Sequence, residues 1–331
     1  MHSNDATRLK VVYILGSARS GSTILDATLG TAGHVLSTGE LGHIFWAFDL
    51  REAPTVRHCS CGLLASDCPL WSQVWSEIQT QRDIEELERE TRRFEAPVRA
   101  IPNLGFGRLF RTRAFREHLD FLGRSVQTVA RIGGTGTIVD SSKGPGRGWL
   151  FSLLPQKDFD VRFVHLVRDG RSVVSSMMTH YEPHKAESTP SPWPSWAAAA
   201  FSTVHWVYMN LFSSLLGALN RGSYLRVRYE DFVSDPLGSL ATIETFLDVD
   251  LSEPRRRISG GQPLSSGHLL CGNRSKASPI LRAKSREATQ SRLPLGPSLV
   301  FFSLGGWLQW LYLRTPSEAS EFRPQVRPGR A

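Results

Sequence analysis

The chain has 331 residues, of which 40% are hydrophobic and 21% charged, fractions that are ordinary for a globular protein with one large core or two smaller ones. Its 39 lysines and arginines outnumber its 31 aspartates and glutamates, and the formal net charge is +8. This surplus favours an anionic ligand, but the basic residues are scattered and match no base-reading fold, so we expect no nucleic-acid partner.

The first predicted element is a buried strand at residues 11–15, followed by the loop Gly16-Ser-Ala-Arg-Ser-Gly-Ser-Thr23 and a helix that begins near Ile24. Such a loop binds a phosphate group, because free backbone N–H groups and the positive end of the helix dipole face the anion. ATP-hydrolysing P-loops carry a lysine before the last residue of this motif. Ser22 takes that place here, and Arg19 is the only long cation in the loop. The sequence therefore predicts a loop that holds a phosphate-like group without hydrolysing ATP.

An aromatic segment and a cysteine-rich loop follow. Gly39-Glu40-Leu-Gly42 opens the aromatic residues 44–48, and Cys59, Cys61 and Cys68 come next, with a fourth cysteine only at position 271. These spacings lack the paired C-x-x-C of common zinc sites, so we expect no metal ligands. Small side chains packed under a loop are the simplest interpretation, and a local redox or metal staple is the alternative.

Strand and helix patterns alternate through the rest of the chain. A charged helical region is predicted over residues 71–131, and a surface loop or lid over 182–196. The predicted strands lie at 137–140, 161–167 and 224–229, and the predicted helices at 172–178, 197–219 and 236–247. Strands separated by helices pair in parallel through right-handed crossovers, and ligands bind at the carboxyl ends of such strands. We therefore predict an α/β protein with a three-layer P-loop-like fold, a central parallel sheet and helical insertions.

We expect no membrane-spanning segment near either end of the sequence. The first strand begins by Val11, which leaves no room for the apolar core of a signal peptide, so a cytoplasmic protein is expected. Residues 298–313 form the most apolar late stretch, but polar residues and glycines interrupt it and it is shorter than a span. We expect a docked C-terminal helix, with peripheral membrane contact as the alternative.

Arg168 and Ser176 form the second predicted anion site. Arg168 ends a strand, and Ser176 lies eight residues later, two turns into the next helix, so a guanidinium and a hydroxyl can converge on one phosphate. On spacing alone, an ion pair between Arg168 and Asp169 and an ordinary helical serine explain the pattern at least as well.

Several of these segments together resemble the motifs of one enzyme family. The loop at residues 16–23 resembles the 5′-phosphosulfate loop of sulfotransferases that use 3′-phosphoadenosine 5′-phosphosulfate (PAPS), and is most similar to the tyrosylprotein and bacterial branch. Leu166-Val-Arg-Asp-Gly-Arg-Ser-Val-Val-Ser-Ser176 resembles the family's 3′-phosphate motif. The other similar segments follow in the family's order: Gly39-Glu40, Asp140-Ser-Ser-Lys143, Arg228-Tyr-Glu-Asp231 with Asp235-Pro236, and His268 with Gly272-Asn-Arg274. The resemblance covers roughly residues 11–274. More faintly, it extends to the predicted C-terminal helix. We expect a single sulfotransferase domain over residues 1–315, with the helical insertion at about 71–131, and a disordered tail at 316–331.

The resemblance implies that the sulfuryl group of PAPS moves to an acceptor hydroxyl by in-line displacement, with 3′-phosphoadenosine 5′-phosphate (PAP) as product. Arg19 and Lys143 match the cations that stabilise the leaving oxygen. Glu40 matches the general base, and His43 is the second choice. Without the resemblance, an ion pair between Lys143 and Asp140 would be the preferred interpretation.

The same resemblance assigns the donor-binding residues. Arg168 and Ser176 match the pair that holds the 3′-phosphate. The remaining donor-binding positions that it implies are Ser20, Gly21, Ser22, Thr23, Tyr229, Gly272, Asn273 and Arg274, together with Arg19. It implies no metal ligand and no metal requirement.

Two other functions stay open at this point. A kinase-like P-loop phosphotransferase would need a metal-binding carboxylate, which Asp140 imitates, and the lysine that Ser22 replaces. A non-catalytic nucleotide-binding protein would keep the pocket but would leave Glu40 and Lys143 unexplained. A small molecule, a glycan, a lipid and a peptide fit the acceptor role about equally well.

Overall fold

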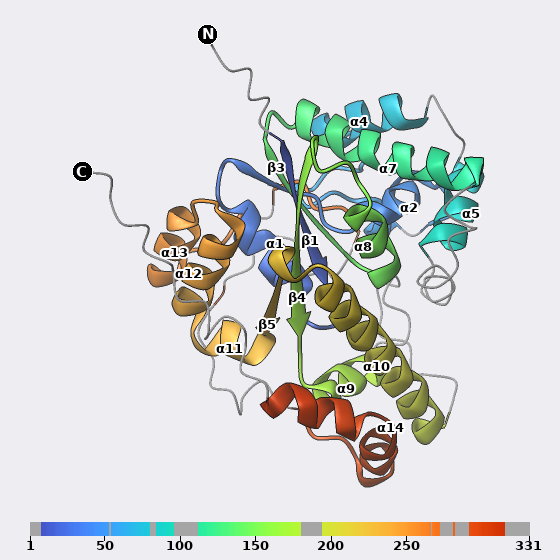
Figure 1. Ribbon diagram of the computed structural model, residues 1–331, viewed down its shortest axis with the longest axis vertical. Helices are drawn as coiled ribbons and strands as arrows, with labels where there is room; N and C mark the ends of the chain where they lie inside the picture. Colours follow the sequence, from blue (N-terminus) through green and yellow to red (C-terminus); the bar gives the residue numbers. More distant parts are fainter. Residues whose placement is uncertain are drawn as a thin grey trace.

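Five parallel strands form the centre of the molecule (Figure 1). The computed structural model describes residues 8–52, 54–79, 84–95, 112–179, 194–265, 267–271, 281 and 291–314. The strand order is β2-β3-β1-β4-β5. Their bounds are β1 Leu9–Leu15, β2 Val35–Ser37, β3 Thr137–Lys143, β4 Phe159–Val167 and β5 Tyr224–Arg228. The predicted α/β fold with a central parallel sheet is confirmed.

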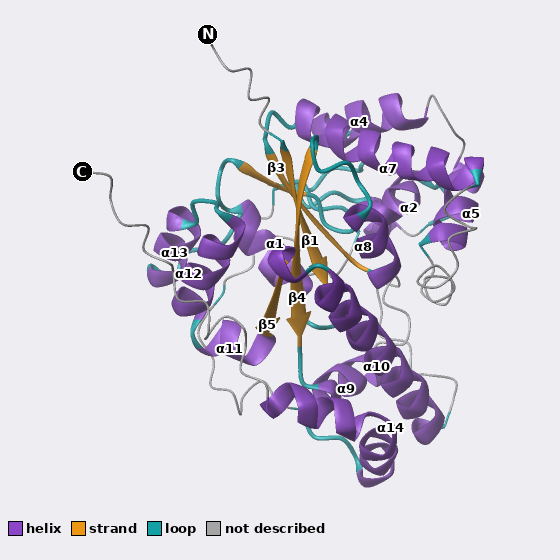
Figure 2. Cartoon of the chain, viewed as in Figure 1, coloured by secondary structure: helices purple, strands orange, loops and turns teal. Residues whose placement is uncertain are grey.

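Helices cover both faces of this sheet and its carboxyl end (Figure 2). Their bounds are α1 Ser22–Gly30, η1 Leu41–His43, α2 Ile44–Phe48, α3 Pro54–Arg57, α4 Pro69–Gln79, α5 Ile84–Phe94, α7 Arg113–Ile132, α8 Pro145–Ser152, α9 Gly170–Thr179, α10 Ser195–Leu219, η3 Arg221–Ser223, α11 Tyr229–Ser234, α12 Pro236–Leu247, α13 Ser252–Ser259 and α14 Leu295–Arg314. The described part of the helical insertion therefore consists of α4, α5 and α7.

The alternation of side chains along β1 explains the layers. Val11, Tyr13 and Leu15 belong to one core cluster with α2, α4, α5, α7 and α8, whereas Val12 and Ile14 belong to another with α1, α11 and α12. Successive side chains of a strand point to opposite faces, so a strand covered on both faces is apolar throughout. Figure 1 shows α11, α12 and α13 on one side of the sheet and α4, α5 and α7 on the other.

Some element ends differ from the predictions. β3 continues to Lys143, three residues beyond the predicted end, and β5 ends at Arg228, so that Tyr229 begins α11 instead of ending the strand. β2 was not predicted, because three residues carry no readable alternation. These shifts leave the polar segments at the carboxyl ends of the strands, where the site was expected.

The helix α14 is docked, as predicted, and the structure shows that it packs against α10. Phe301, Leu308 and Tyr312 are buried against Trp206, and the Tyr312 hydroxyl donates to the carbonyl oxygen of Asn210 at 3.0 Å. Within the described ranges, no helix combines the length and the hydropathy needed to cross a membrane. The predicted lid at 182–196 lies outside the described residues except at its end, and so does the predicted tail at 316–331.

Candidate functional site

A cavity of about 420 Å³ lies at the carboxyl ends of the strands. Its walls come from the loop after β1, the turn after β2, the end of β3, the segment after β4 and the start of α11. The predicted site residues that line it are Arg19, Gly21, Ser22, Thr23, Glu40, Lys143, Arg168, Ser176 and Tyr229. Ser20 is buried in the loop without lining the cavity, and Gly272, Asn273 and Arg274 lie outside the described residues.

Two glycines give the loop after β1 its shape. Gly16 has φ +141°, and a Cβ on it would lie 2.5 Å from the carbonyl oxygen of Leu166. Gly21 has φ +95° and caps α1, and its Cβ would lie 2.4 Å from the ring of Tyr229. Larger residues would therefore clash at either position, and also be strained. The first N–H groups of α1 have no acceptor inside the helix, so this tight loop directs them at an anion.

The two arginines and Ser176 form a connected group on one side of the cavity. Arg19 Nε donates to Ser176 Oγ at 3.0 Å, and Arg168 Nη1 donates to the carbonyl oxygen of Arg19 at 2.9 Å. The Arg168 guanidinium lies 4.6 Å from the centre of the Tyr229 ring. Burial lowers the pKa of Arg19, and the charge of Arg168 lowers it further. An anion bound beside both side chains would offset this repulsion between two positive charges.

The alternative of an Arg168–Asp169 pair is not what the structure has. Asp169 instead binds Arg171, whose Nε donates at 3.0 Å. Among the described residues, Arg168 Nε and Ser20 Oγ are buried without a hydrogen-bond partner. Buried polar groups are normally paired, and Arg168 lines the cavity, so its Nε fits a ligand that brings its own acceptor oxygen.

Glu40 and Lys143 meet on another side of the cavity. Lys143 Nζ donates to Glu40 Oε1, and the ring nitrogen Nδ1 of His43 lies 3.2 Å from Glu40 Oε2. Burial by itself raises the pKa of Glu40, but the Lys143 ammonium and the His43 ring outweigh it and hold that pKa well below its usual value. The His43 ring stacks on Trp46, with 4.2 Å between ring centres. Asp140 binds Arg147 at 3.0 Å instead of Lys143.

The two predicted catalytic cations, Arg19 and Lys143, both have a positive φ, a strained backbone conformation for residues other than glycine. Arg19 has φ +66° and Lys143 has φ +69°, and the described residues contain only two further non-glycine residues with positive φ. Such conformations persist only where the surroundings impose them, and they concentrate at functional sites. The strain is thus an observation, independent of any motif, that points to these two positions.

Asp26 is a site residue that the sequence analysis missed. Its carboxylate is fully buried under the turn that carries Glu40, where Oδ2 accepts from the Gly39 N–H at 3.1 Å and from Ser141 Oγ at 2.6 Å. Burial raises the pKa of Asp26 to about 7, although these hydrogen bonds oppose the shift. The signal was the one charged residue within the helix Ser22–Gly30. Asp26 positions the turn and does not line the cavity.

Comparisons with known proteins give a family and a fold. A sequence model of the sulfotransferase family matches residues 12–253. The sulfotransferase domain from the curacin biosynthetic pathway is 16% identical, with 90% of this chain and 98% of that chain covered and a TM-score of 0.51, a likeness that shows the fold. The sulfotransferase domain of the Synechococcus PCC 7002 olefin synthase is 21% identical, with coverages of 89% and 94% and a TM-score of 0.48. A search of curated protein sequences gave no match.

Proposed function

The chain belongs to the sulfotransferase family, and we propose that it transfers the sulfuryl group of PAPS to an acceptor hydroxyl, with PAP as the second product. One observation carries the proposal: a single cavity is lined by the phosphate loop, by Arg168 and Ser176, and by Glu40 and Lys143. These groups lie at or after the carboxyl ends of four different strands, β1 to β4, and the proposed reaction uses all of them.

The donor carries anionic groups at both ends of its ribose, and the cavity offers a cationic partner for each. We assign the 5′-phosphosulfate to the backbone N–H groups of residues 21–23, which line the cavity, assisted by the hydroxyls of Ser22 and Thr23. The Ser20 N–H instead donates to the carbonyl oxygen of Ser17 at 3.3 Å. We assign the 3′-phosphate to Arg168 and Ser176, because both line the cavity and Arg168 Nε is a buried donor without an acceptor among the described residues. Tyr229 supports both assignments, since its ring contacts the Arg168 guanidinium and packs against Gly21.

The proposed reaction is an in-line displacement at sulfur. Glu40 takes the proton of the acceptor hydroxyl while the hydroxyl oxygen forms the new S–O bond. Arg19 and Lys143 stabilise the electron pair that stays on the phosphate oxygen of PAP when the old S–O bond breaks. Lys143 must turn from Glu40 to that oxygen, which also removes the main charge that depresses the pKa of Glu40. The ion pair thus couples donor binding to activation of the base.

The contacts of Asp140 argue against the phosphotransferase alternative, which needs this carboxylate to bind a metal ion. Asp140, the residue that imitates a metal-binding carboxylate, is fully buried and accepts from Arg147 Nε and from Ser142. Ser22 still stands where the catalytic lysine of P-loop enzymes would be. Membership of the tyrosylprotein and bacterial branch, a metal-free reaction and a cytoplasmic location stay predictions.

The decisive experiment incubates the full chain with radiolabelled PAPS and an extract of the native cells, in buffer without Mg²⁺, and then identifies the labelled product. Transfer of label to a hydroxyl-bearing molecule, with equivalent release of PAP, is expected. Donor binding without transfer to any acceptor would instead support a nucleotide-binding protein. Phosphate transfer from ATP that depends on added Mg²⁺ would support the phosphotransferase.

A further inference from the structure

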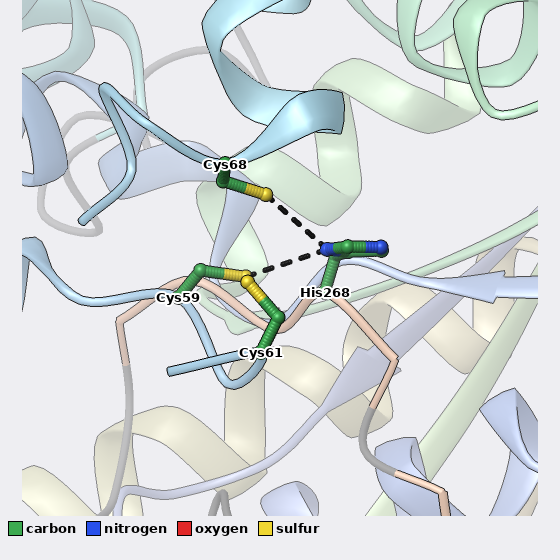
Figure 3. A group of neighbouring side chains, drawn as sticks. All are labelled: Cys59, Cys61, Cys68 and His268. Carbon is green, nitrogen blue, oxygen red and sulfur yellow. Dashed lines mark hydrogen bonds between the residues drawn. The ribbon is translucent and has the colours of Figure 1, made fainter. Parts of the chain in front are cut away.

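Three cysteines and a histidine meet at one point beside the sheet (Figure 3). The sulfur atoms of Cys59, Cys61 and Cys68 and one ring nitrogen of His268 all lie within 4.8 Å of one another. Nδ1 of His268 is 3.2 Å from Cys68 Sγ and 3.7 Å from Cys59 Sγ. We propose that these four side chains bind one Zn²⁺ ion as a structural site.

The spacing of the four atoms fits this ion. Bonds of about 2.3 Å to sulfur and about 2.0–2.1 Å to nitrogen, in a tetrahedron, separate a sulfur from the nitrogen by about 3.6 Å and two sulfurs by about 3.8 Å. The distance from His268 Nδ1 to Cys59 Sγ, 3.7 Å, matches the first of these values, and the distance to Cys68 Sγ, 3.2 Å, is slightly shorter. Three thiolates and one imidazole are an established donor set for structural zinc, and soft thiolates disfavour Mg²⁺ and Ca²⁺.

The surrounding backbone is already arranged to support thiolate ligands. Burial raises the pKa of Cys59 and Cys68, and neighbouring backbone N–H groups oppose this shift. The N–H groups of Leu70 and Trp71, at the start of α4, act on the sulfur of Cys68, and the N–H of Cys61 acts on the sulfur of Cys59. The carbonyl oxygen of His268 accepts from the indole Nε1 of Trp71 at 2.7 Å, which fixes the histidine segment against the same helix. Hydrogen bonds to the residues that bind a metal ion hold those side chains in the orientation that binding requires.

The two ligand-bearing segments are also joined to each other without the ion. The Ser60 N–H donates to the carbonyl oxygen of Leu269 at 3.0 Å, and the Leu269 N–H donates to Ser60 Oγ at 2.8 Å. His268 lies 200 residues after Cys68, so no sequence spacing reveals the fourth ligand. The expectation of no metal ligands rested on the three cysteines alone.

The proposed zinc site is linked to the cavity by a short bridge between the segment that carries His268 and the turn that carries Glu40. Leu270, two residues after His268, forms a bridge with Gly39, and its carbonyl oxygen accepts from the Glu40 N–H at 3.0 Å. The Leu270 N–H donates to the carbonyl oxygen of Thr38 at 2.9 Å. With four protein ligands, the ion has no open position for a substrate. Its role is therefore to hold the segment on which the Glu40 turn is built.

The test measures metal in the full chain, purified under reducing conditions without chelator. Plasma mass spectrometry should find about one Zn²⁺ per chain. Cys68→Ser and His268→Ala should each lose most of it. The matched controls are Cys271→Ser, a buried cysteine outside the cluster, and His58→Ala, the neighbour of Cys59, and both should keep it.

A second measurement needs no variant and so does not depend on variant folding. The chelated wild-type chain is titrated with Co²⁺, and the visible spectrum of a tetrahedral cobalt–thiolate centre should appear and then vanish when Zn²⁺ is added. The proposal is overturned if the chain binds no metal, if both ligand variants keep full zinc content, or if peptide mapping finds a disulfide among the three cysteines. None of these readouts involves sulfuryl transfer, so they succeed or fail independently of the proposed function.

Discussion

Lys143 donates a hydrogen bond to Glu40 in the cavity, although the two residues lie 103 positions apart in the chain. Both side chains are only 12% exposed, so water screens their charges little, and each charge is neutralised mainly by the other. The proposed mechanism gives them separate tasks, proton removal for Glu40 and charge stabilisation for Lys143. Their pairing therefore provides a direct way to test the assignment of the base.

Glu40→Gln should lower turnover by about 10²- to 10⁴-fold, the usual contribution of a general base, because an amide cannot accept the hydroxyl proton. The affinity for PAP should stay close to that of the wild type, since the phosphate-binding groups are untouched. Steady-state kinetics and calorimetric titration with PAP measure the two effects. Glu77→Gln, which removes an exposed partner of Arg131, is the matched control and should change neither. Full activity of Glu40→Gln would disprove the assignment and make His43 the next candidate.

Arg168→Ala should weaken PAP binding by roughly 10- to 100-fold, because a charge-assisted hydrogen bond contributes about 1.5–3 kcal/mol. Adenosine 5′-phosphosulfate lacks the 3′-phosphate, so its binding should change far less. This second ligand also detects general damage to the loop, since Arg168 binds the Arg19 carbonyl as well. Arg171→Ala, which removes a partner of Asp169 just after the site, serves as the control. Equal losses for both ligands would remove Arg168 from the 3′-phosphate site.

Gly21→Ala should impair donor binding through a clash as well as through strain. The new Cβ would lie 2.4 Å from the Tyr229 ring at a φ of +95°, and a left-handed residue alone costs about 1–2 kcal/mol. Gly134→Ala is the matched control, because Gly134 also has a positive φ of +64° but no atom lies within 4 Å of its Cβ position. PAP titration should show a clear loss for the first variant only. If Gly21→Ala binds PAP as the wild type does, the loop does not need this glycine to hold the donor.

Local signals in the sequence were sufficient for much of the fold. The helix Pro236–Leu247 has the predicted bounds, because Asp235 caps its first turn by accepting from the Gly238 N–H and proline suits the first helical position. The strand β1 was readable because both faces are buried. The edge strand β2 was not, since its three residues are held by pairing with β3 and not by any pattern of their own.

The candidate site was only partly predictable, because its pairings are long-range. The motifs located the loop, Glu40, Lys143 and Arg168 near one cavity. They could not give the partner of Lys143, which is Glu40 in the structure, because Asp140 is taken by Arg147. Asp26 was missed for a similar reason: a buried carboxylate is explained only by the N–H and hydroxyl groups that the fold brings to it.

The last prediction concerns the pH dependence of stability, to which a buried histidine in β4 should contribute. His165 Nδ1 accepts from the Tyr224 hydroxyl at 2.6 Å and its Nε2 donates to Asn210 Oδ1 at 3.0 Å, an arrangement that suits the neutral ring. Burial lowers the pKa of His165 to about 3, against about 6.5 in an unfolded chain. Below about pH 6.5 the unfolded state therefore binds a proton that the folded state does not. Its contribution to the free energy of unfolding should fall by at most about 1.4 kcal/mol per pH unit down to about pH 3.

Asp26 opposes this trend, so variants are needed to separate the two groups. Its pKa is raised to about 7, so between about pH 4 and pH 7 the folded state holds a proton that the unfolded state releases, and this contribution falls as the pH rises. Urea denaturation at several pH values from about 7.5 to 5 should show a smaller loss on acidification for His165→Asn than for the wild type, and a larger loss for Asp26→Asn. Both variants lose hydrogen bonds and should be less stable at neutral pH. The test is therefore the slope of the free energy of unfolding against pH, and not its value at one pH. An unchanged slope in His165→Asn would mean that the folded protein protonates His165 as readily as the unfolded chain does.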